Sequence, residues 1–217
     1  MANVFGFVKN CVGLWLKGGK YYWTWLGFLS LMVVSGVLAY INQATHGLIL
    51  TNMSDHTSWG FYIGNFTFLV GVAAAAVMLV IPAYIYSWGP IKEVVLLGEM
   101  LAISALIVCM LFVTADIGRP DRFFHLFPLI GKPNFPRSLL SWDVLVLNIY
   151  LIVNLFIVTY LLFCGYLGKE YSKSILIPVV LFSIPAGVGI HTVTAFLYNG
   201  IAARPFWNAS ILAPRFL

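Results

Sequence analysis

The stretch that decides the fold is ALIVCMLFVTADIGRPDR, residues 105–122. It begins as a continuous apolar run and then places Asp116, Arg119, Asp121 and Arg122 close together. Ionisable groups at membrane depth are expensive, and they indicate a functional role until shown otherwise. The stretch therefore predicts a membrane-spanning helix whose end carries a candidate functional site.

The composition of the whole chain agrees with a membrane protein. Of its 217 residues, 61% are hydrophobic and 9% are charged, whereas a soluble domain has about 25% charged residues. The net charge of +5 is spread over the predicted loops, so it does not indicate nucleic-acid binding. The three cysteines lack CxxC or CxxCH spacing, which argues against an iron–sulfur cluster or a c-type haem held within this chain.

A membrane-spanning helix needs about 20 predominantly apolar residues. The segments that meet this length are 22–44, 59–87, 91–116, 139–165 and 174–199. We therefore predict an all-α integral membrane protein, a helical bundle with about five transmembrane helices. Residues 1–20 are expected to form an N-terminal cytoplasmic or interfacial segment and residues 21–200 the five-helix transmembrane bundle. Residues 201–217 are expected to form a loop and the start of a sixth, truncated span.

The orientation is predicted from basic residues in the loops. With the N-terminus inside, the inner and the outer face receive the same number of basic residues. The inner set, however, consists entirely of lysines and contains the N-terminal cluster. That cluster usually weighs most in the positive-inside rule. We therefore expect a multi-pass protein of a prokaryotic cytoplasmic (inner) membrane with its N-terminus in the cytoplasm.

Counting depth along these spans brings polar residues from all five to one level near the outer face. At 1.5 Å per residue, Asn65 lies within about 9 Å of the start of the second span and His191 about 12 Å below the end of the fifth. The candidate site residues at this level are His46, Trp59, Tyr62, Asn65, Asp116, Arg119, Trp142, Asp143 and His191. In the inner half, Glu99 is the only acid that the pattern buries, and it is a candidate proton-path residue.

The fifth predicted span has an unusual sequence before its histidine. Pro185, Gly187 and Gly189 precede His191, and a proline frees a backbone carbonyl one turn earlier. Irregular backbone at membrane depth is tolerated where it lines a cavity or is covered by protein. We therefore expect a kinked helix that presents His191 to a ligand pocket.

These residue types suit quinone chemistry. Oxidation of a quinol or reduction of a quinone needs hydrogen-bonding groups at the ring oxygens and a proton carrier, and histidine supplies both near neutral pH. The hypothesis assigns hydrogen bonding or proton relay to His191 and Asp116. Arg119 would fix Asp116, while Trp59, Tyr62 and Trp142 would shape the pocket.

Each of these residues also has a purely structural interpretation. His191 can bond to a backbone carbonyl, and Asp116 can pair with Arg119 or Arg122 to fix a loop. Asp143 can serve the start of its helix by favouring the macrodipole. Glu99 can be a satisfied polar contact. The shared depth of the group, not any single residue, favours the functional interpretation.

An ordered set of motifs resembles the NrfD/PsrC-like (polysulfide reductase membrane subunit) family. The motifs are Asp116-Ile-Gly-Arg-Pro-Asp-Arg, Ser141-Trp142-Asp143, His191, Arg204-Pro205-Phe206-Trp207 and Leu212-Ala-Pro. The resemblance covers essentially the whole chain. Within the family it is strongest to the branch found in sulfite-reduction-associated Dsr complexes, which implies anaerobic respiration and sulfur metabolism.

The resemblance implies a helical subunit that holds no haem or iron–sulfur cluster and binds menaquinone. Its partner would be a ferredoxin-like iron–sulfur subunit on the outer face, with a multihaem cytochrome c and other membrane subunits in the complex. Arg122, Lys132 and Arg137 would then form a docking surface for that partner. Family members have eight to ten spans, so we expect this chain to be the N-terminal part of such a subunit.

Two other classes of function remain open at this point. One is a membrane cytochrome that binds haem b, which would need facing pairs of intramembrane histidines. The other is a transporter or a structural membrane anchor. For a transporter, a second broken helix in a matching position would be expected.

Overall fold

The computed structural model of the protein describes residues 2–54, 56–57, 59–126, 130–200, 207–211 and 214. Within these ranges every regular element is helical. The elements are α1 (Ala2–Trp15), α2 (Lys20–His46), η1 (Leu48–Thr51), α3 (Phe61–Val80), η2 (Ile81–Ile85), α4 (Gly89–Asp116), η3 (Pro120–Leu126), α5 (Leu139–Tyr166) and α6 (Lys173–Asn199). Five are long and apolar enough to cross a membrane, namely α2, α3 with η2, α4, α5 and α6. The predicted fold class is confirmed.

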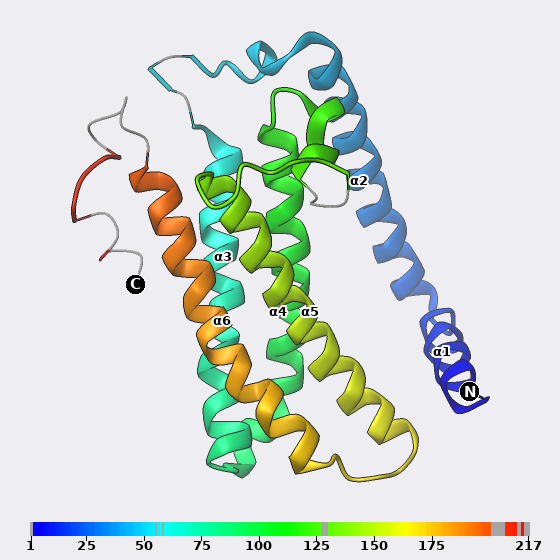
Figure 1. Cartoon of the computed structure of the whole chain (residues 1–217). Helices are drawn as coiled ribbons and strands as arrows, with labels where there is room; N and C mark the ends of the chain where they lie inside the picture. The colour runs from blue at the N-terminus through cyan, green and yellow to red at the C-terminus, as the bar shows by residue number, and fades with distance from the viewer. Residues whose placement is uncertain are drawn as a thin grey trace.

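Helices α3 to α6 form an up-and-down bundle, in which each helix runs against the one before it (Figure 1). One end of the bundle holds the last residues of α4 and α6 and the first residues of α3 and α5. We call it the Asp116 end. The other end holds the turns from α3 to α4 and from α5 to α6, and we call it the opposite end. Short connections at the opposite end favour antiparallel packing of α3 with α4 and of α5 with α6, whereas the connection from α4 to α5 is longer and contains η3.

The core of the bundle consists of two buried clusters, one in each half. Near the Asp116 end the cluster includes Phe66, Leu147 and Ile190, and towards the opposite end it includes Val95 and Leu176. All five of these side chains are almost fully buried. The hydrophobic periphery of the bundle is exposed, as expected for helices that face lipid.

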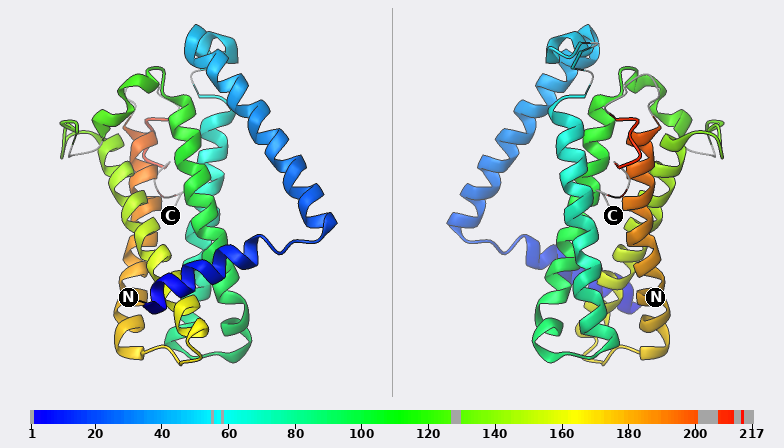
Figure 2. Two further views of the ribbon diagram at one scale, coloured as in Figure 1. Left: turned by 90° about the vertical axis from the view of Figure 1, so that its right-hand side faces the viewer. Right: turned by 90° about the vertical axis from the view of Figure 1, so that its left-hand side faces the viewer.

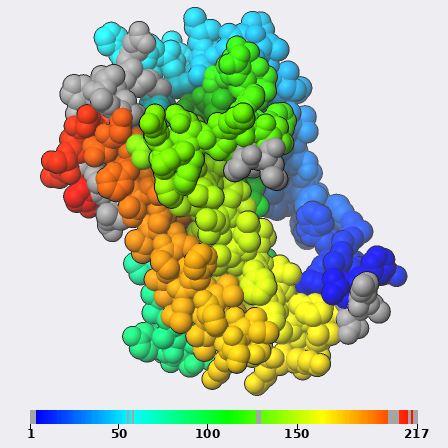
Figure 3. Space-filling view, in the orientation of Figure 1, coloured from blue at the N-terminus to red at the C-terminus, as the bar shows by residue number. Residues whose placement is uncertain are grey.

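Helix α2 stands apart from this bundle. Its most apolar stretch buries no residue within the chain, and it diverges from α3 to α6 away from the Asp116 end (Figure 2). It is tied to the bundle at the Asp116 end, where Gln43 donates to the carbonyl of Ala115 at 2.7 Å and accepts from the hydroxyl of Tyr62 at 2.7 Å. The lower half of α2 stands clear of α5 (Figure 3).

Helix α1 lies across the bundle towards the opposite end (Figure 2). Phe7 makes edge-to-face contacts with Phe163 and Tyr166 of α5, with ring centroids 5.5 and 5.6 Å apart. Many of the apolar side chains of α1, including Phe5 and Trp15, are exposed. An exposed apolar helix beside the ends of membrane spans fits the predicted interfacial segment.

Two local features differ from the sequence prediction. The second span ends in a π-helical turn, η2, with Pro82 near its start, and no pattern in the sequence predicted this turn. The prediction of irregular backbone at Pro185 is wrong, because α6 is one continuous helix through Pro178 and Pro185. Prolines are tolerated inside membrane helices when surrounding groups compensate for the lost backbone bond.

The prediction for residues 201–217 is mostly untested. Trp207 to Ile211 lie in turns and bends. Residues 201–206, 212–213 and 215–217 lie outside the described residues, and with them Arg204, Pro205 and the expected start of a sixth span.

Candidate functional site

Asp143 of α5 is the buried carboxyl on which the site is built. Ser138 caps α5, and its Oγ accepts a hydrogen bond from the N–H of Ser141 at 3.3 Å. Asp143 therefore lies inside the helix, is 1% exposed, and accepts through Oδ1 from the hydroxyl of Thr194 at 2.8 Å. Its Oδ2 is buried and has no hydrogen-bond partner among the described residues. Ser138, and not Asp143, is thus the residue that caps the start of α5.

Three other helices bring polar groups to Asp143. Thr67 of α3 shares a hydrogen bond with the hydroxyl of Tyr198 on α6, and Tyr198 is close enough to Asp143 and Asp116 to interact with them electrostatically. We call Thr67, Asp116, Asp143, Thr194 and Tyr198 the carboxyl cluster. Helices α3, α4, α5 and α6 thus bring polar residues together at the Asp116 end.

Asp116 is the last residue of α4, and its environment differs from the prediction. Its Oδ1 is buried without a hydrogen-bond partner in the described part of the chain. Arg119, which was expected to fix Asp116, instead pairs with Asp121. Its Nε and Nη2 atoms donate to the two carboxylate oxygens at 3.0 and 2.9 Å. The prediction that Arg119 holds Asp116 is wrong, because the planar guanidinium finds a two-pronged partner two residues away.

The Arg119–Asp121 pair is exposed to solvent on both sides. The two hydrogen bonds from the guanidinium hold the pKa of Asp121 below its ordinary value, and the same bonds raise the pKa of Arg119. Exposed ion pairs of this kind contribute little to stability. The pair links Arg119, which precedes η3, to Asp121 in the first turn of η3.

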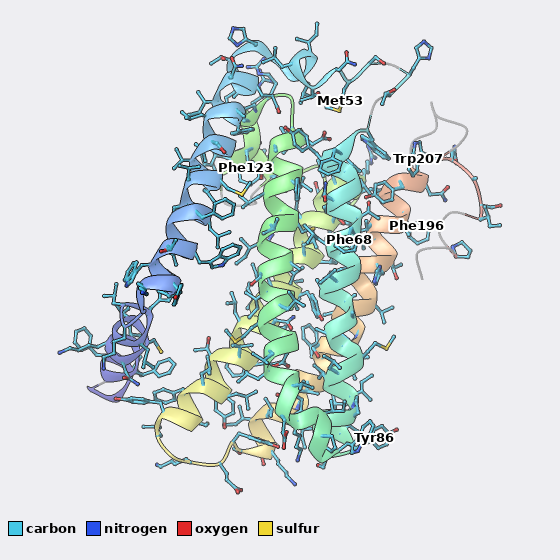
Figure 4. The ribbon with its side chains drawn as sticks, turned by 180° about the vertical axis from the view of Figure 1, so that it is seen from behind. Met53, Phe68, Tyr86, Phe123, Phe196 and Trp207 are labelled. Carbon is cyan, nitrogen blue, oxygen red and sulfur yellow. The ribbon has the colours of Figure 1, made fainter. Side chains whose placement is uncertain are left out.

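Aromatic side chains cover the carboxyl cluster on the side of α3 and α6. Trp59 packs edge-to-face against Tyr198 with ring centroids 5.1 Å apart. The ring centroid of Trp207 lies 5.2 Å from that of Trp59. Figure 4 shows Trp207 beside the ends of α3 and α6 at this level. The predicted role of Trp59 in shaping the site fits this packing.

The other predicted pocket residues have partners outside the carboxyl cluster. Tyr62 donates to Gln43 of α2, and Asn65 donates to the carbonyl of Phe61 in its own helix. Trp142 packs against Phe135 with the two rings tilted and their centroids 4.3 Å apart. The remaining one, His46, is exposed at the end of α2 and bonds through Nδ1 within that helix.

His191 lies one turn before Thr194 on α6 and is partly buried. Its Nδ1 is buried and has no hydrogen-bond partner among the described residues. The structural alternative, a ring nitrogen satisfied by a backbone carbonyl, is therefore not found at Nδ1. A buried ring nitrogen without a partner is available to a ligand or to a proton.

Glu99 occupies the half of the bundle towards the opposite end. It is 0% exposed, and neither carboxyl oxygen has a hydrogen-bond partner in the described ranges. Tyr84 and Tyr150 are near enough to interact with it electrostatically. A satisfied polar contact for Glu99 is therefore not found among the described residues.

A hollow of about 360 Å³ adjoins the carboxyl cluster between α4 and α5, and Asp143 is part of its lining. A second hollow, of about 470 Å³, lies beside it along an adjoining face of α5. Leu126, Val144 and Asn148 line both. On the outside of the same end, Arg122, Lys132 and Arg137 are exposed, as a docking surface requires.

Several residues of the site were missed from the sequence. Thr67, Thr194 and Asn148 have no charge, and a single hydroxyl or amide in an apolar helix is common. The signal that was present is spacing, because Thr194 and Tyr198 follow His191 at three and seven positions, on one face of α6. Gln43 could have been noticed as an amide near the end of a long apolar run. It is the amide at that position that the fold buries.

The comparison with known families covers the part of the chain that holds this site. The sequence matches the family described as "Polysulphide reductase, NrfD" over residues 49–217. The chain belongs to this family. Membership of the NrfD family confirms the resemblance found in the motifs, while the expected similarity to the Dsr branch stays a prediction.

Two curated relatives of this NrfD-family chain are subunits of reductases. One is a putative dimethyl sulfoxide reductase membrane subunit of Halobacterium salinarum, 28% identical over 208 residues, which cover 89% of this chain and 47% of the relative. The other is a selenate reductase subunit of Mesobacillus selenatarsenatis, 24% identical over 233 residues, which cover 91% of this chain and 52% of the relative. The chain spans about half the length of these relatives.

Proposed function

We propose that this chain is a membrane subunit of a respiratory reductase complex that binds a hydroquinone, menaquinol, at the Asp116 end of the bundle. Electrons would pass between the bound quinone and an iron–sulfur subunit docked at the same end. The names of the two curated relatives support a reductase complex. The chain would supply the binding site and the groups that take up protons.

The observation that carries this proposal is the buried Asp143 carboxyl. It lies in an apolar interior, uses Oδ1 to accept from Thr194, and leaves Oδ2 without a partner among the described residues. An unpaired polar atom at membrane depth is costly and marks a site of function. Oδ2 is placed to accept a hydrogen bond from a hydroquinone hydroxyl.

The reaction sets what the site must provide. Oxidation of a hydroquinone to the quinone releases two electrons and two protons. The electrons go to the iron–sulfur partner, and the protons go to bases at the site. Asp143, His191 and Asp116 each have a buried atom without a hydrogen-bond partner in the described ranges, and we assign proton uptake to these three groups.

The partner would dock on the exposed basic residues at the Asp116 end. Arg122, Lys132 and Arg137 would meet acidic groups of the iron–sulfur subunit, because complementary charge directs such encounters. A multihaem cytochrome c and further membrane subunits would complete the complex. The Asp116 end would then be extracytoplasmic and the N-terminus cytoplasmic.

Glu99 is proposed to serve a proton path from the opposite end. Its oxygens lack partners in the described part of the chain, so it can change its protonation without breaking a hydrogen bond. This role is separate from the hydroquinone site.

The test uses membranes that contain the assembled complex with Asp143→Asn. We expect hydroquinone-dependent reduction of the acceptor to fall by about 10²-fold or more, the usual scale for loss of a general base. Asp116→Asn and His191→Ala should also lower the rate, and His191→Ala should weaken binding of a fluorescent hydroquinone analogue. Glu93→Gln, an exposed acid at the start of α4, is the matched control and should leave the rate unchanged.

Assembly is checked by co-purification of the partner subunits. An assembled Asp143→Asn complex that oxidises hydroquinone at the wild-type rate would contradict the assignment of Asp143. If the wild-type complex neither binds nor oxidises the hydroquinone, the proposed function itself is wrong.

A further inference from the structure

The α4–α5 hollow opens to the side of the molecule at membrane depth. Its lining from α4 includes Ile107 and Leu111, which are 45% and 60% exposed. Both lie within a helix long and apolar enough to span a membrane. The hollow therefore adjoins the hydrocarbon region of the bilayer, whereas water lies beyond the ends of the helices.

Helix η3 closes the hollow at the Asp116 end. Phe123 and Leu126 contribute its lining there, and Figure 4 labels Phe123 near this end, on the side of the bundle where α2 lies. The exposed Arg119–Asp121 pair lies at the start of η3, on the solvent side. The hollow is thus covered towards water and accessible from lipid.

Three polar side chains, Thr114, Asp143 and Asn148, stand in this mostly apolar wall, and the hydroxyl of Thr114 donates to the carbonyl of Met110 in its own helix. Asp143 brings the buried Oδ2 that lacks a partner in the described ranges. Asn148 donates through Nδ2 to the carbonyl of Val144 at 2.7 Å, and no described residue donates to its Oδ1. A ligand site of about 300–1,000 Å³ with apolar walls and a few polar groups is typical for small molecules, and about 360 Å³ falls in this range.

The second hollow adjoins the first on a neighbouring face of α5. It shares Leu126, Val144 and Asn148 with the first and continues to Pro133 and Phe135. Its lining is almost entirely apolar. Helix α5 and the loop before it face the viewer in Figure 3, and α2 does not cover them there. An apolar chain attached to a ring in the first hollow has a continuous apolar surface to follow.

We propose that a hydroquinone with a long apolar tail passes from the bilayer into the α4–α5 hollow and is bound there by Asp143 and Asn148. This rests on the proposed function and identifies the route and a second binding residue. One hydroxyl of the ring donates to Oδ2 of Asp143, and the amide of Asn148 forms a hydrogen bond with a ring oxygen. The tail lies against Val144 and Leu126 and continues into lipid.

Two variants test the route in membranes that contain the assembled complex. Val144→Trp fills the junction of the two hollows, and Asn148→Leu keeps the volume but removes the amide. Leu155→Trp, at an exposed position further along α5, is the control for a bulky side chain on the lipid-facing surface. The substrate is a long-tailed hydroquinone, and co-purification of the partner subunits shows assembly.

We expect Val144→Trp and Asn148→Leu each to raise the KM for hydroquinone about tenfold, which corresponds to about 1.4 kcal/mol of binding. Leu155→Trp should keep the wild-type KM. Wild-type KM values in both Val144→Trp and Asn148→Leu would overturn the proposal, and the hollow would then be a groove for lipid acyl chains. If Val144→Trp does not assemble, the KM of Asn148→Leu alone decides.

The outcome separates this proposal from the broader one. If Asp143→Asn abolishes hydroquinone oxidation while both hollow variants keep the wild-type KM, the hydroquinone site stands and the route between α4 and α5 is wrong. If the wild-type complex oxidises no hydroquinone, both proposals fail.

Discussion

Two aspartates at one end of the bundle show how position decides the role of a carboxyl. Asp121 is exposed and bonded twice by Arg119, so its negative charge is neutralised by a partner and by water. Asp143 is buried and bonded once, by a neutral hydroxyl. Only the buried carboxyl retains an oxygen without a partner within the described ranges. For this reason the proposed proton uptake includes Asp143 and not Asp121.

Gln43 gives a residue-scale prediction about the attachment of α2. It donates to the carbonyl of Ala115 and accepts from the hydroxyl of Tyr62, both at 2.7 Å. Gln43→Leu leaves both groups without this partner, and each unpaired buried group costs about 1–3 kcal/mol. We expect a lower Tm for the purified protein in detergent.

The matched control is Asn42→Leu, the same kind of substitution at the neighbouring exposed position. It should leave the Tm nearly unchanged. Equal Tm values for Gln43→Leu and Asn42→Leu would show that these two hydrogen bonds do not hold α2 to the bundle.

At the scale of elements, α6 packs closely against α3 because of one glycine. A methyl group at Gly187 would stand 2.5 Å from a methyl of Val77, which is too close for two carbons. Small residues at helix contacts permit such approaches in membrane bundles. The contact places α6, and therefore His191, Thr194 and Tyr198, at a fixed depth against α3.

Gly187→Ala is therefore expected to destabilise the bundle, because overpacking a tight contact typically costs about 1–3 kcal/mol. Gly189→Ala is the control two residues further along α6, where an added methyl meets nothing within 4 Å. That variant should be neutral or slightly stabilising, since alanine favours a helix over glycine by about 0.5–1 kcal/mol. Thermal unfolding of both variants gives the comparison. A Gly187→Ala protein as stable as Gly189→Ala would contradict the tight packing of α3 and α6.

The elements themselves follow from the sequence, but their local deviations do not. Apolar runs of sufficient length predicted all five spans, and charged or aromatic residues marked their ends. The π-helical turn at Ile81–Ile85 and the continuous helix through Pro185 depend on what packs around them. A proline in the sequence shows that one backbone bond is lost, but not whether the neighbouring helices compensate for it.

The site was predictable in depth and not in pairing. Counting residues along helices placed Asp116, Asp143 and His191 near one end, and the structure has them there. Which side chains touch depends on how each helix is rotated about its own axis. These spans are apolar on nearly all sides, so the sequence does not determine that rotation. For this reason the Thr194–Asp143 bond was missed, and Arg119 was assigned to the wrong aspartate.

At the scale of the whole molecule, the function depends on which end of the bundle faces which side of the membrane. The carboxyl cluster, the α4–α5 hollow and the exposed Arg122, Lys132 and Arg137 all belong to the Asp116 end. Under the proposed function, an iron–sulfur partner within electron-transfer reach of the hydroquinone would have to dock at that end. The proposed topology therefore requires the loop before α5 and the loop before α6 to lie on opposite sides.

Cysteine labelling tests this topology. Lys132→Cys and Lys169→Cys place exposed thiols in the loops at the two ends, in a background with the exposed Cys11 changed to serine. With the N-terminus in the cytoplasm, a membrane-impermeant maleimide should label Lys132→Cys in intact cells from outside. It should label Lys169→Cys only after the membrane is opened, because that loop lies at the opposite end. Labelling of Lys169→Cys alone in intact cells would invert the orientation and place the hydroquinone site and its partner on the cytoplasmic side.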